Sequence, residues 1–209
     1  MMHVDVIIDV VCPWCYVGKR RLDQAIAACD EPIDVQYRPF LLAPDMPREG
    51  KDRKQHFAEK FGANADVSKM TEHLRSQAQD IDFQFETITR VPNTVDAHRL
   101  IGWAYAQSRQ SEVVEAVFAA YFTQGEDIGC SDVLAKIAGA CGMDSEIVAH
   151  LLQTDKDAAT VRSSAMQASG MGIQGVPFYI FGGAVALSGA QSPDVLLQGV
   201  TKAKEAAAA

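Results

Sequence analysis

The hydrophobic pattern divides the chain into a strand-rich beginning, a long helical middle and a strand-rich end. Residues 4–11 form an apolar run in which only two aspartates are polar. Such a run is typical of a central strand whose two faces are both buried. A helix is expected from about residue 15 until Pro32, and residues 33–40 alternate as a second strand. This β-α-β order predicts two parallel strands joined by a right-handed crossover.

The middle of the chain, residues 52–172, has the periodicity of helices almost throughout. Pro44, Pro47 and Gly50 mark the loop that leads into it. The apolar spacing predicts seven helices, at residues 52–61, 67–80, 94–108, 112–123, 131–141, 145–153 and 156–169. These residues are therefore expected to form a helical bundle.

The end of the chain returns to strands. Residues 176–181 predict a strand, and a pair of glycines predicts a tight turn into an antiparallel partner at residues 184–187. A last helix is expected at residues 193–204, followed by a frayed tail at residues 206–209.

The strands at the two ends of the chain predict one small four-stranded mixed sheet. We therefore expect an α/β fold in which residues 1–43 and 173–209 are two halves of one domain. Residues 44–172 form an all-helical domain inserted between them. The insertion is expected to cover the end of the sheet that carries Cys12, because the second strand leaves the sheet there.

Composition narrows the class of partner. A chain of 209 residues, 48% of them hydrophobic, can bury a core without disulfide support. Its net charge of −8 and pI near 5.1 argue against nucleic acid or an anionic membrane as a partner. No apolar stretch of membrane-spanning length and no signal-peptide pattern is present, so we expect a cytoplasmic protein. Its partners are expected to be proteins or small molecules.

The segment Cys12-Pro13-Trp14-Cys15 lies where the first strand gives way to the first helix. Two thiols at this spacing and junction are typical of a redox pair. The free N–H groups and the dipole at the start of a helix favour the Cys12 thiolate, which is the form that attacks a disulfide. Cys15 is close enough to displace the mixed disulfide that results. Pro13 is tolerated because the first helical turn has no partner for its N–H group.

The other cysteines do not suggest a metal site. A zinc site needs a second close pair of ligands, and Cys29, Cys130 and Cys141 form none in the sequence. Cys29 and Cys141 fall on apolar helical stripes and are expected to be core thiols, whereas Cys130 lies in a more exposed loop. Asp9 is either a proton relay for Cys15 or a hydrogen-bonded structural acid, and the sequence leaves both interpretations open.

Several short motifs together resemble a known family. The chain is similar to DsbA-like thioredoxin-fold oxidoreductases, and within them to the frenolicin-biosynthesis (FrnE-like) branch. The resemblance spans nearly the whole chain and implies a thioredoxin-like fold with an inserted helical domain. The motifs that carry it include Cys12-Pro13-Trp14-Cys15, Pro92-Asn93-Thr94, Ala97-His98-Arg99, Gly175-Val176-Pro177-Phe178 and Ser188-Gly189-Ala190-Gln191.

The resemblance also implies roles for individual residues. It places a cis peptide bond between Val176 and Pro177 beside the cysteines, where the backbone of Val176 docks an extended peptide or glutathione. Trp14 and Pro13 belong to the same substrate-binding surface. Asn93 and His98 are placed on the helical lid over the site. There His98 orients the substrate, stabilises the Cys12 thiolate, or is simply a hydrogen-bonded interface histidine.

These features give a first functional hypothesis and an alternative. The first is a protein disulfide oxidoreductase or isomerase in which Cys12 attacks and Cys15 resolves. It needs no permanently bound cofactor beyond the redox-active Cys12–Cys15 disulfide, and glutathione is a candidate co-substrate. The alternative is a glutathione-dependent isomerase or transferase acting on an aromatic or polyketide-like molecule. This alternative is based on two related groups of enzymes, the 2-hydroxychromene-2-carboxylate isomerases and the kappa-class glutathione transferases.

Two departures from those relatives favour the first hypothesis. The glutathione-dependent relatives typically have a serine in place of Cys12 and tend to have an acid in place of Gln191. A serine cannot form a mixed disulfide, whereas Cys12 and Cys15 together form a reversible pair. A homodimer is a further expectation from the resemblance.

Overall fold

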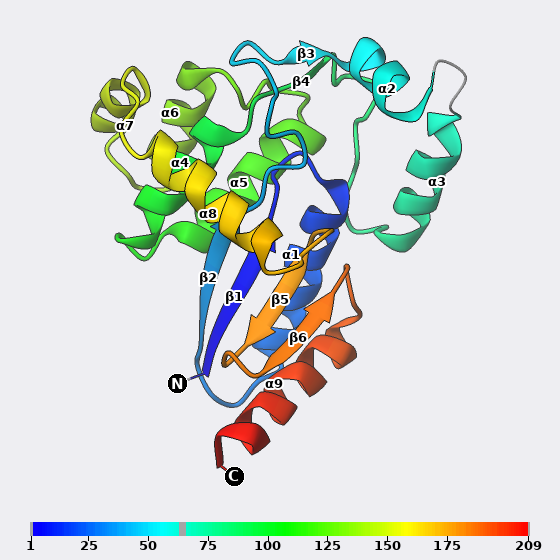
Figure 1. Ribbon diagram of the computed structural model, residues 1–209, viewed down its shortest axis with the longest axis vertical. Coiled ribbons are helices and arrows are strands. Elements are labelled where there is room, and N and C mark those ends of the chain that lie inside the picture. Colours follow the sequence, from blue (N-terminus) through cyan, green and yellow to red (C-terminus); the bar gives the residue numbers. More distant parts are fainter. Residues whose placement is uncertain (1, 63–65, 209) are drawn as a thin grey trace.

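The computed structural model describes residues 2–62 and 66–208, and its centre is a four-stranded mixed sheet (Figure 1). The strands are ordered β2-β1-β5-β6. Strand β1 pairs in parallel with β2 and antiparallel with β5, and β5 pairs antiparallel with β6. The predicted four-stranded mixed sheet is therefore confirmed. The strand bounds are β1 (Met2–Ile8), β2 (Ile33–Pro39), β5 (Phe178–Phe181) and β6 (Val185–Ser188).

Helices cover both faces of the sheet, as the apolar run in β1 requires. They are α1 (Pro13–Ala27), α8 (Ala158–Gly170) and α9 (Pro193–Ala208). Val4, Val6 and Ile8 are buried in one hydrophobic cluster with α1 and α9. The alternate residue Ile7 is buried in a second cluster with α8, on the opposite face (Figure 1). Successive side chains of β1 point to opposite faces of the sheet, so this one strand contributes to two hydrophobic clusters.

The remaining helices gather over the end of the sheet where β1 leads into α1 (Figure 1). They are α2 (Arg53–Phe61), α3 (Val67–Gln77), α4 (Val95–Tyr105), α5 (Gln110–Phe122), α6 (Ser131–Ala140) and α7 (Ser145–Leu152). This confirms the helical insertion and its expected position. Helix α8 follows them in the chain but packs on the sheet and on α4. The boundaries after residues 43 and 172 remain our proposal.

Strand β1 is shorter than predicted. It was expected to reach residue 11 but ends at Ile8. The amide of Cys12 donates a hydrogen bond to the carbonyl of Asp9 at 3.0 Å, which closes a turn between the strand and α1. Asp9 therefore lies just beyond the sheet, next to the cysteine pair.

Two further differences are local. Strands β3 (Lys51–Asp52) and β4 (Arg90–Val91) form a short antiparallel pair that was not predicted, because two residues show no periodicity. Helix α9 continues to Ala208, so the tail predicted to fray is helical over residues 206–208, and residue 209 lies outside the described part. Among the described residues, no helix is both long and apolar enough to cross a membrane.

A polar cluster ties the insertion to α1. Glu115 on α5 accepts a hydrogen bond from the hydroxyl of Tyr16 at 2.9 Å and forms ion pairs with Lys19 at 2.8 Å and Arg20 at 2.7 Å. Lys19 is only 5% exposed and also pairs with Asp23 at 2.7 Å. One carboxylate of the insertion thus contacts three side chains of the helix that begins after Cys12.

We predict that Glu115→Gln lowers the free energy of unfolding by about 1–3 kcal/mol, because it removes the charge that faces the buried Lys19. Urea denaturation measures this loss. Glu112→Gln is the matched control on the same helix, because the ion pair that Glu112 makes within the described residues is with Arg109, at 3.5 Å, and both side chains are more than half exposed. The control is expected to cost about 0.5 kcal/mol or less. Equal losses in the two variants would contradict this account.

Candidate active site

The two cysteines of the predicted redox pair lie at the start of α1. Cys12 is the residue that caps the helix, with φ −91° and ψ 112°, and Pro13 is the first helical residue. The amide of Cys15 donates to the carbonyl of Cys12 at 3.0 Å, which brings the two residues onto one turn. Both are free thiols, and Cys12 is 7% exposed whereas Cys15 is fully buried. Cys12 is therefore the sulfur within reach of a substrate.

The environment shifts the pKa values of the two thiols in opposite directions. A hydrogen bond from the Cys15 thiol lowers the pKa of Cys12, with help from the backbone amides of Cys15 and Trp14 and against the effect of burial. Burial raises the pKa of Cys15 well above its ordinary value, and the negative charge that forms on Cys12 raises it further. The thiolate therefore forms first on Cys12, and Cys15 keeps its proton.

The segment before β5 lies against the leading sulfur. The peptide bond between Val176 and Pro177 is cis, as the resemblance implied. The Cys12 thiol donates to the carbonyl of Val176 at 3.5 Å. Residues separated by more than 160 positions in sequence thus meet at one sulfur.

Gly18 allows this close approach, because a side chain there would collide with the segment. A β-carbon at Gly18 would lie 2.3 Å from the Tyr179 hydroxyl and 2.7 Å from Cγ of Pro177. Both distances are too short for real contacts, so both groups, or the helix itself, would have to move.

We predict that Gly18→Ala lowers the free energy of unfolding by about 1–3 kcal/mol and displaces Pro177 from the cysteines. Thermal and urea unfolding measure the first effect, and the rate of Cys12 alkylation reports the second. Gly102→Ala in α4 is the matched control, since a β-carbon there meets no atom of the described residues within 4 Å. The control is expected to gain about 0.5–1 kcal/mol from helix propensity alone. If Gly18→Ala stabilised the protein as much as the control, the packing argument would be wrong.

A mainly apolar cavity of about 210 Å³ extends from Cys12 toward α2 and α3. Phe61 and Met70 at its rim are 40% and 54% exposed. The guanidinium of Arg53 lies 4.8 Å from the ring centre of Phe57 and donates to the carbonyl of Phe85 at 3.1 Å. The residues that line the cavity are Val11, Cys12, Pro13, Trp14, Leu42, Arg53, Phe57, Lys60, Phe61, Val67, Met70, Thr71, Leu74, Phe85, Ile88, Tyr121 and Phe122. This wall can hold an apolar group that carries a negative charge, within reach of the sulfur.

The structure places the predicted site residues in two groups. Pro13 and Trp14 line the cavity beside Cys12, and the Val176–Pro177 bond lies on another side of the sulfur. Asn93 and His98 are not among the described residues that line the cavity. Their roles as substrate contacts are therefore not supported by their positions.

Asn93 and His98 both make internal contacts instead. The side-chain Nδ2 of Asn93 donates to the carbonyl of Met46 at 2.6 Å, and its Oδ1 accepts from the backbone amide of Val95 at 3.0 Å. These two bonds fix the start of α4. His98 is 3% exposed, and its Nε2 atom lies 3.5 Å from Oδ1 of Asp9. Of the roles considered for His98, this position agrees with that of a buried histidine at the interface between the insertion and the sheet.

The part of the cavity wall that comes from the insertion was not predicted from the sequence. Arg53, Phe57 and Met70 lie on α2 and α3, which the apolar periodicity predicted as ordinary amphipathic helices. Helix α2 has no buried residue, so its apolar side chains face the cavity more than a core. Periodicity shows that a helix has an apolar face but not what that face contacts.

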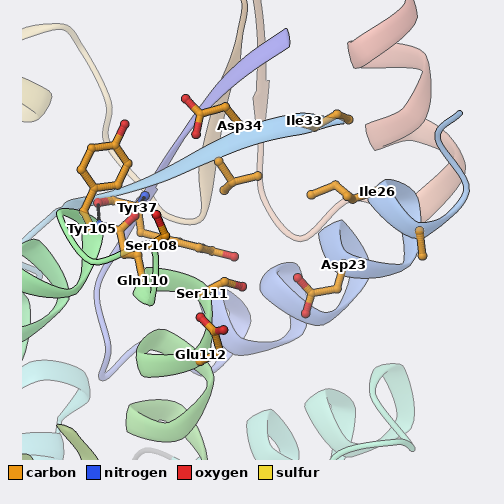
Figure 2. A pocket seen from close by; sticks show the side chains of 12 residues that line it. Asp23, Ile26, Ile33, Asp34, Tyr37, Tyr105, Ser108, Gln110, Ser111 and Glu112 are labelled. Carbon is orange, nitrogen blue, oxygen red and sulfur yellow. Dashed lines mark hydrogen bonds between the residues drawn. The ribbon is translucent and has the colours of Figure 1, made fainter. Parts of the chain in front are cut away.

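A second, larger cavity of about 660 Å³ is separate from the cysteines (Figure 2). It runs along the edge strand β2, between α1 and the start of α5, and none of the described residues that line it is a cysteine. Gln110 closes one end: its side chain accepts from the amide of Tyr37 at 2.8 Å and donates to the carbonyl of Tyr37 at 3.1 Å. The side chain of Gln110 thus bonds to the backbone N–H and carbonyl of Tyr37, as a neighbouring strand would at this edge of the sheet.

Comparison with known proteins places this geometry in a family. A family model described as a DSBA-like thioredoxin domain matches residues 3–200. Among solved structures, a probable DsbA oxidoreductase from Streptomyces coelicolor is similar, with 28% identity and a TM-score of 0.87. That match covers 98% of this chain and 91% of the other.

Two further matches have different descriptions. The uncharacterized protein YwbO of Bacillus subtilis is 27% identical over 201 residues, which is 96% of each chain. A 2-hydroxychromene-2-carboxylate isomerase has a TM-score of 0.73 over 99% of this chain and 98% of its own, at 16% identity, which shows a shared fold alone. The narrower frenolicin-biosynthesis branch stays a prediction.

Proposed function

We propose that this chain, which belongs to the family of DSBA-like thioredoxin domains, catalyses thiol–disulfide exchange through Cys12 and Cys15. The observation that carries the proposal is the asymmetry of the two sulfurs. Cys12 lies at a cavity wall with a lowered pKa, whereas Cys15 is buried with a raised one. Two inert core thiols would not need such different environments.

The exchange has two steps. The Cys12 thiolate attacks one sulfur of a substrate disulfide, forms a mixed disulfide and releases the other sulfur as a thiolate. Cys15 then loses its proton and attacks Cys12, which breaks the bond to the substrate and leaves the Cys12–Cys15 disulfide. The substrate gains two electrons and the protein loses two. The reverse sequence oxidises a dithiol substrate.

The substrate surface has two parts in this proposal. The carbonyl of Val176 is directed at Cys12, and the backbone around Pro177 offers an extended peptide or glutathione a place to pair. The cavity under α2 and α3 accepts an apolar side chain from the same substrate. No permanently bound cofactor is needed, because the electrons are stored in the two sulfurs.

We predict that Cys12→Ser abolishes the reduction of insulin disulfides and the refolding of a scrambled protein, because a serine hydroxyl cannot form the mixed disulfide. Cys15→Ala is expected to stop after the first step and accumulate a mixed disulfide that mass spectrometry detects. Cys130→Ser is the matched control, since Cys130 is exposed and far from the pair in sequence. Full turnover by Cys12→Ser would refute the proposal.

We predict that the Cys12 thiol titrates below the range of an ordinary cysteine and that Cys15→Ala raises its pKa, because the variant removes the hydrogen bond from the Cys15 thiol. The ultraviolet absorbance of the thiolate measures both titrations. Since only the thiolate reacts, the alkylation rate of the wild type should rise with pH up to this pKa and then level off, and the variant should level off at a higher pH. A lower pKa in Cys15→Ala would contradict the assigned cause.

A second candidate is a glutathione-dependent isomerase or transferase acting on an aromatic acid. It is favoured by the lining of the cavity, where Arg53 lies among aromatic rings and can pair with a carboxylate. Such chemistry does not require a second thiol. Full activity of Cys15→Ala on such a substrate, dependent on added glutathione, would favour this candidate over disulfide exchange.

We also propose a cytosolic location and a homodimer. An odd count of five scattered cysteines, which is unlike a disulfide scaffold, supports an intracellular protein. Light scattering after size-exclusion chromatography tests the homodimer.

A further inference from the structure

The cavity beside Cys12 carries positive charge without a matching acid. Arg53 and Lys60 line it, and none of the described residues in its lining is an aspartate or a glutamate. The charge of Glu86 reaches Arg53, but Glu86 pairs with Arg75 at 2.8 Å and its side chain is 67% exposed. Within the described parts of the chain, the guanidinium of Arg53 therefore has no counter-ion.

The surroundings of Arg53 leave most of its hydrogen-bonding capacity unused. Its guanidinium lies 4.8 Å from the ring centre of Phe57 and donates to the carbonyl of Phe85 at 3.1 Å. That bond uses one of five N–H donors, and the side chain makes no other hydrogen bond to a described residue. Burial lowers the pKa of Arg53, because the rings around it solvate a charge less well than water does. An anion that entered the cavity would offset this cost.

The backbone of Arg53 is fixed by the short sheet of β3 and β4. Helix α2 begins at Arg53, directly after Asp52 of β3, which lies opposite Arg90 of β4. The amide of Arg53 donates to the carbonyl of Thr89 at 2.9 Å, and the side chain of Asp52 accepts from the amide of Gln55 at 2.9 Å. A donor on such a fixed backbone loses less conformational entropy when it binds a ligand than one on a mobile loop.

The size and lining of the cavity limit what can enter. Its volume of about 210 Å³ is smaller than the roughly 300–1,000 Å³ of sites that enclose a whole drug-sized ligand. It therefore has room for one side chain or one ring of a substrate. The walls are mainly apolar and include the rings of Trp14, Phe57 and Phe85. They suit an apolar stem, and a carboxylate at the end of that stem matches the planar fork of Arg53.

We propose that Arg53 makes the protein select disulfides in which the attacked sulfur carries a carboxylate on a short apolar or aromatic stem. The inference rests on the exchange reaction proposed above and names its substrate class. The Cys12 thiolate forms a bond to the sulfur that carries this group. The other sulfur leaves as a thiolate with the electron pair of the broken bond. Arg53 bonds to none of the reacting atoms, so it is a specificity-determining residue.

The overall charge of the protein makes a local cation necessary for such a substrate. A net charge of −8 repels an anion at a distance. At physiological salt this repulsion is screened beyond about 8 Å, so the charges that line the cavity decide which group is held there.

The test compares two aromatic disulfides that release a coloured product. Dithionitrobenzoate has a carboxylate on each ring, and dithiodipyridine has none. Stopped-flow absorbance measures the first release by reduced full-length protein. We expect Arg53→Gln to lower the ratio of the two rates, anionic over neutral, on the order of 10- to 100-fold, because a charge-assisted hydrogen bond is lost. Both disulfides react with the same thiolate, so the ratio cancels any change in the pKa of Cys12.

Lys54→Gln is the matched control. It makes the same change of charge at the next residue of α2, but Lys54 is exposed and is not among the residues that line the cavity. The ratio should change by less than about 2-fold, because the exposed charge is screened. Arg53→Lys should keep part of the selectivity, since it retains the charge but not the planar donors. Equal ratios in Arg53→Gln and Lys54→Gln would overturn the proposal.

A pair of peptides shows whether the acid can come from a polypeptide. The two differ only in a glutamate or a glutamine after their cysteine, which is activated as a mixed disulfide with thiopyridine. Attack on the peptide sulfur releases the coloured thiopyridone and leaves the peptide on Cys12. An Arg53-dependent preference for the glutamate peptide extends the substrate class to acidic polypeptides. A preference confined to the aromatic pair restricts it to small aromatic acids.

A measurement on the unmodified protein guards against variants that do not fold. Nitrobenzoate and nitrobenzamide share a ring and differ in charge. We expect nitrobenzoate to slow the alkylation of Cys12 by iodoacetamide, which is neutral, and nitrobenzamide to leave the rate unchanged. Equal protection by the two compounds, or protection by neither, would overturn the selection of anions.

Failure of the exchange reaction would be recognised separately. The first release needs Cys12 alone, so the ratio is measurable even if Cys15 does not resolve the mixed disulfide. Release of a single equivalent from dithiodipyridine by the wild type would refute exchange through the pair. Release of two equivalents, with an unchanged ratio in Arg53→Gln, would refute the selection alone.

Discussion

The effect of the Cys15 thiol on the Cys12 sulfur is the interaction on which the site depends, because it is the main cause of the lowered pKa of Cys12. It requires one sulfur at the amino end of α1 and the other one turn further, inside the core. The chain meets this requirement by ending β1 at Ile8 and turning at Asp9, so that the helix begins with Pro13. The same turn places the Asp9 carboxylate behind the pair. One local geometry therefore sets both the reactivity of Cys12 and the surroundings of Cys15.

The second constraint is that three distant segments must meet around this turn. Gly18 lets the Val176–Pro177 segment approach α1, and Glu115 holds α1 against the insertion. Helices α2 and α3 then add the apolar wall with Arg53. Because the wall comes from the insertion, the chemistry of the sulfurs and the choice of substrate are carried by different parts of the chain. This separation agrees with a fold that supports several reactions in related proteins.

Charge is distributed unevenly between the two cavities. The chain is acidic overall, yet Arg53 and Lys60 line the cavity beside Cys12. The cavity along β2 is lined by Asp23, Asp34 and Glu112 (Figure 2). An anionic or electron-rich substrate is therefore favoured at the sulfurs rather than at the larger cavity. The size of a cavity is a poorer guide to the site here than the groups that line it.

The sequence by itself determined the cysteine pair, the order of the elements and the inserted position of the helices. These follow from local signals: apolar runs and periodicity define elements, and the Cys12–Cys15 spacing defines the pair. Only the tertiary structure decided which helices form the cavity wall, that Asn93 serves α4, and that His98 faces Asp9. The physical reason is that an amphipathic helix or a lone buried histidine has no partner encoded nearby. Its contact comes from packing between residues as far apart as positions 9 and 98.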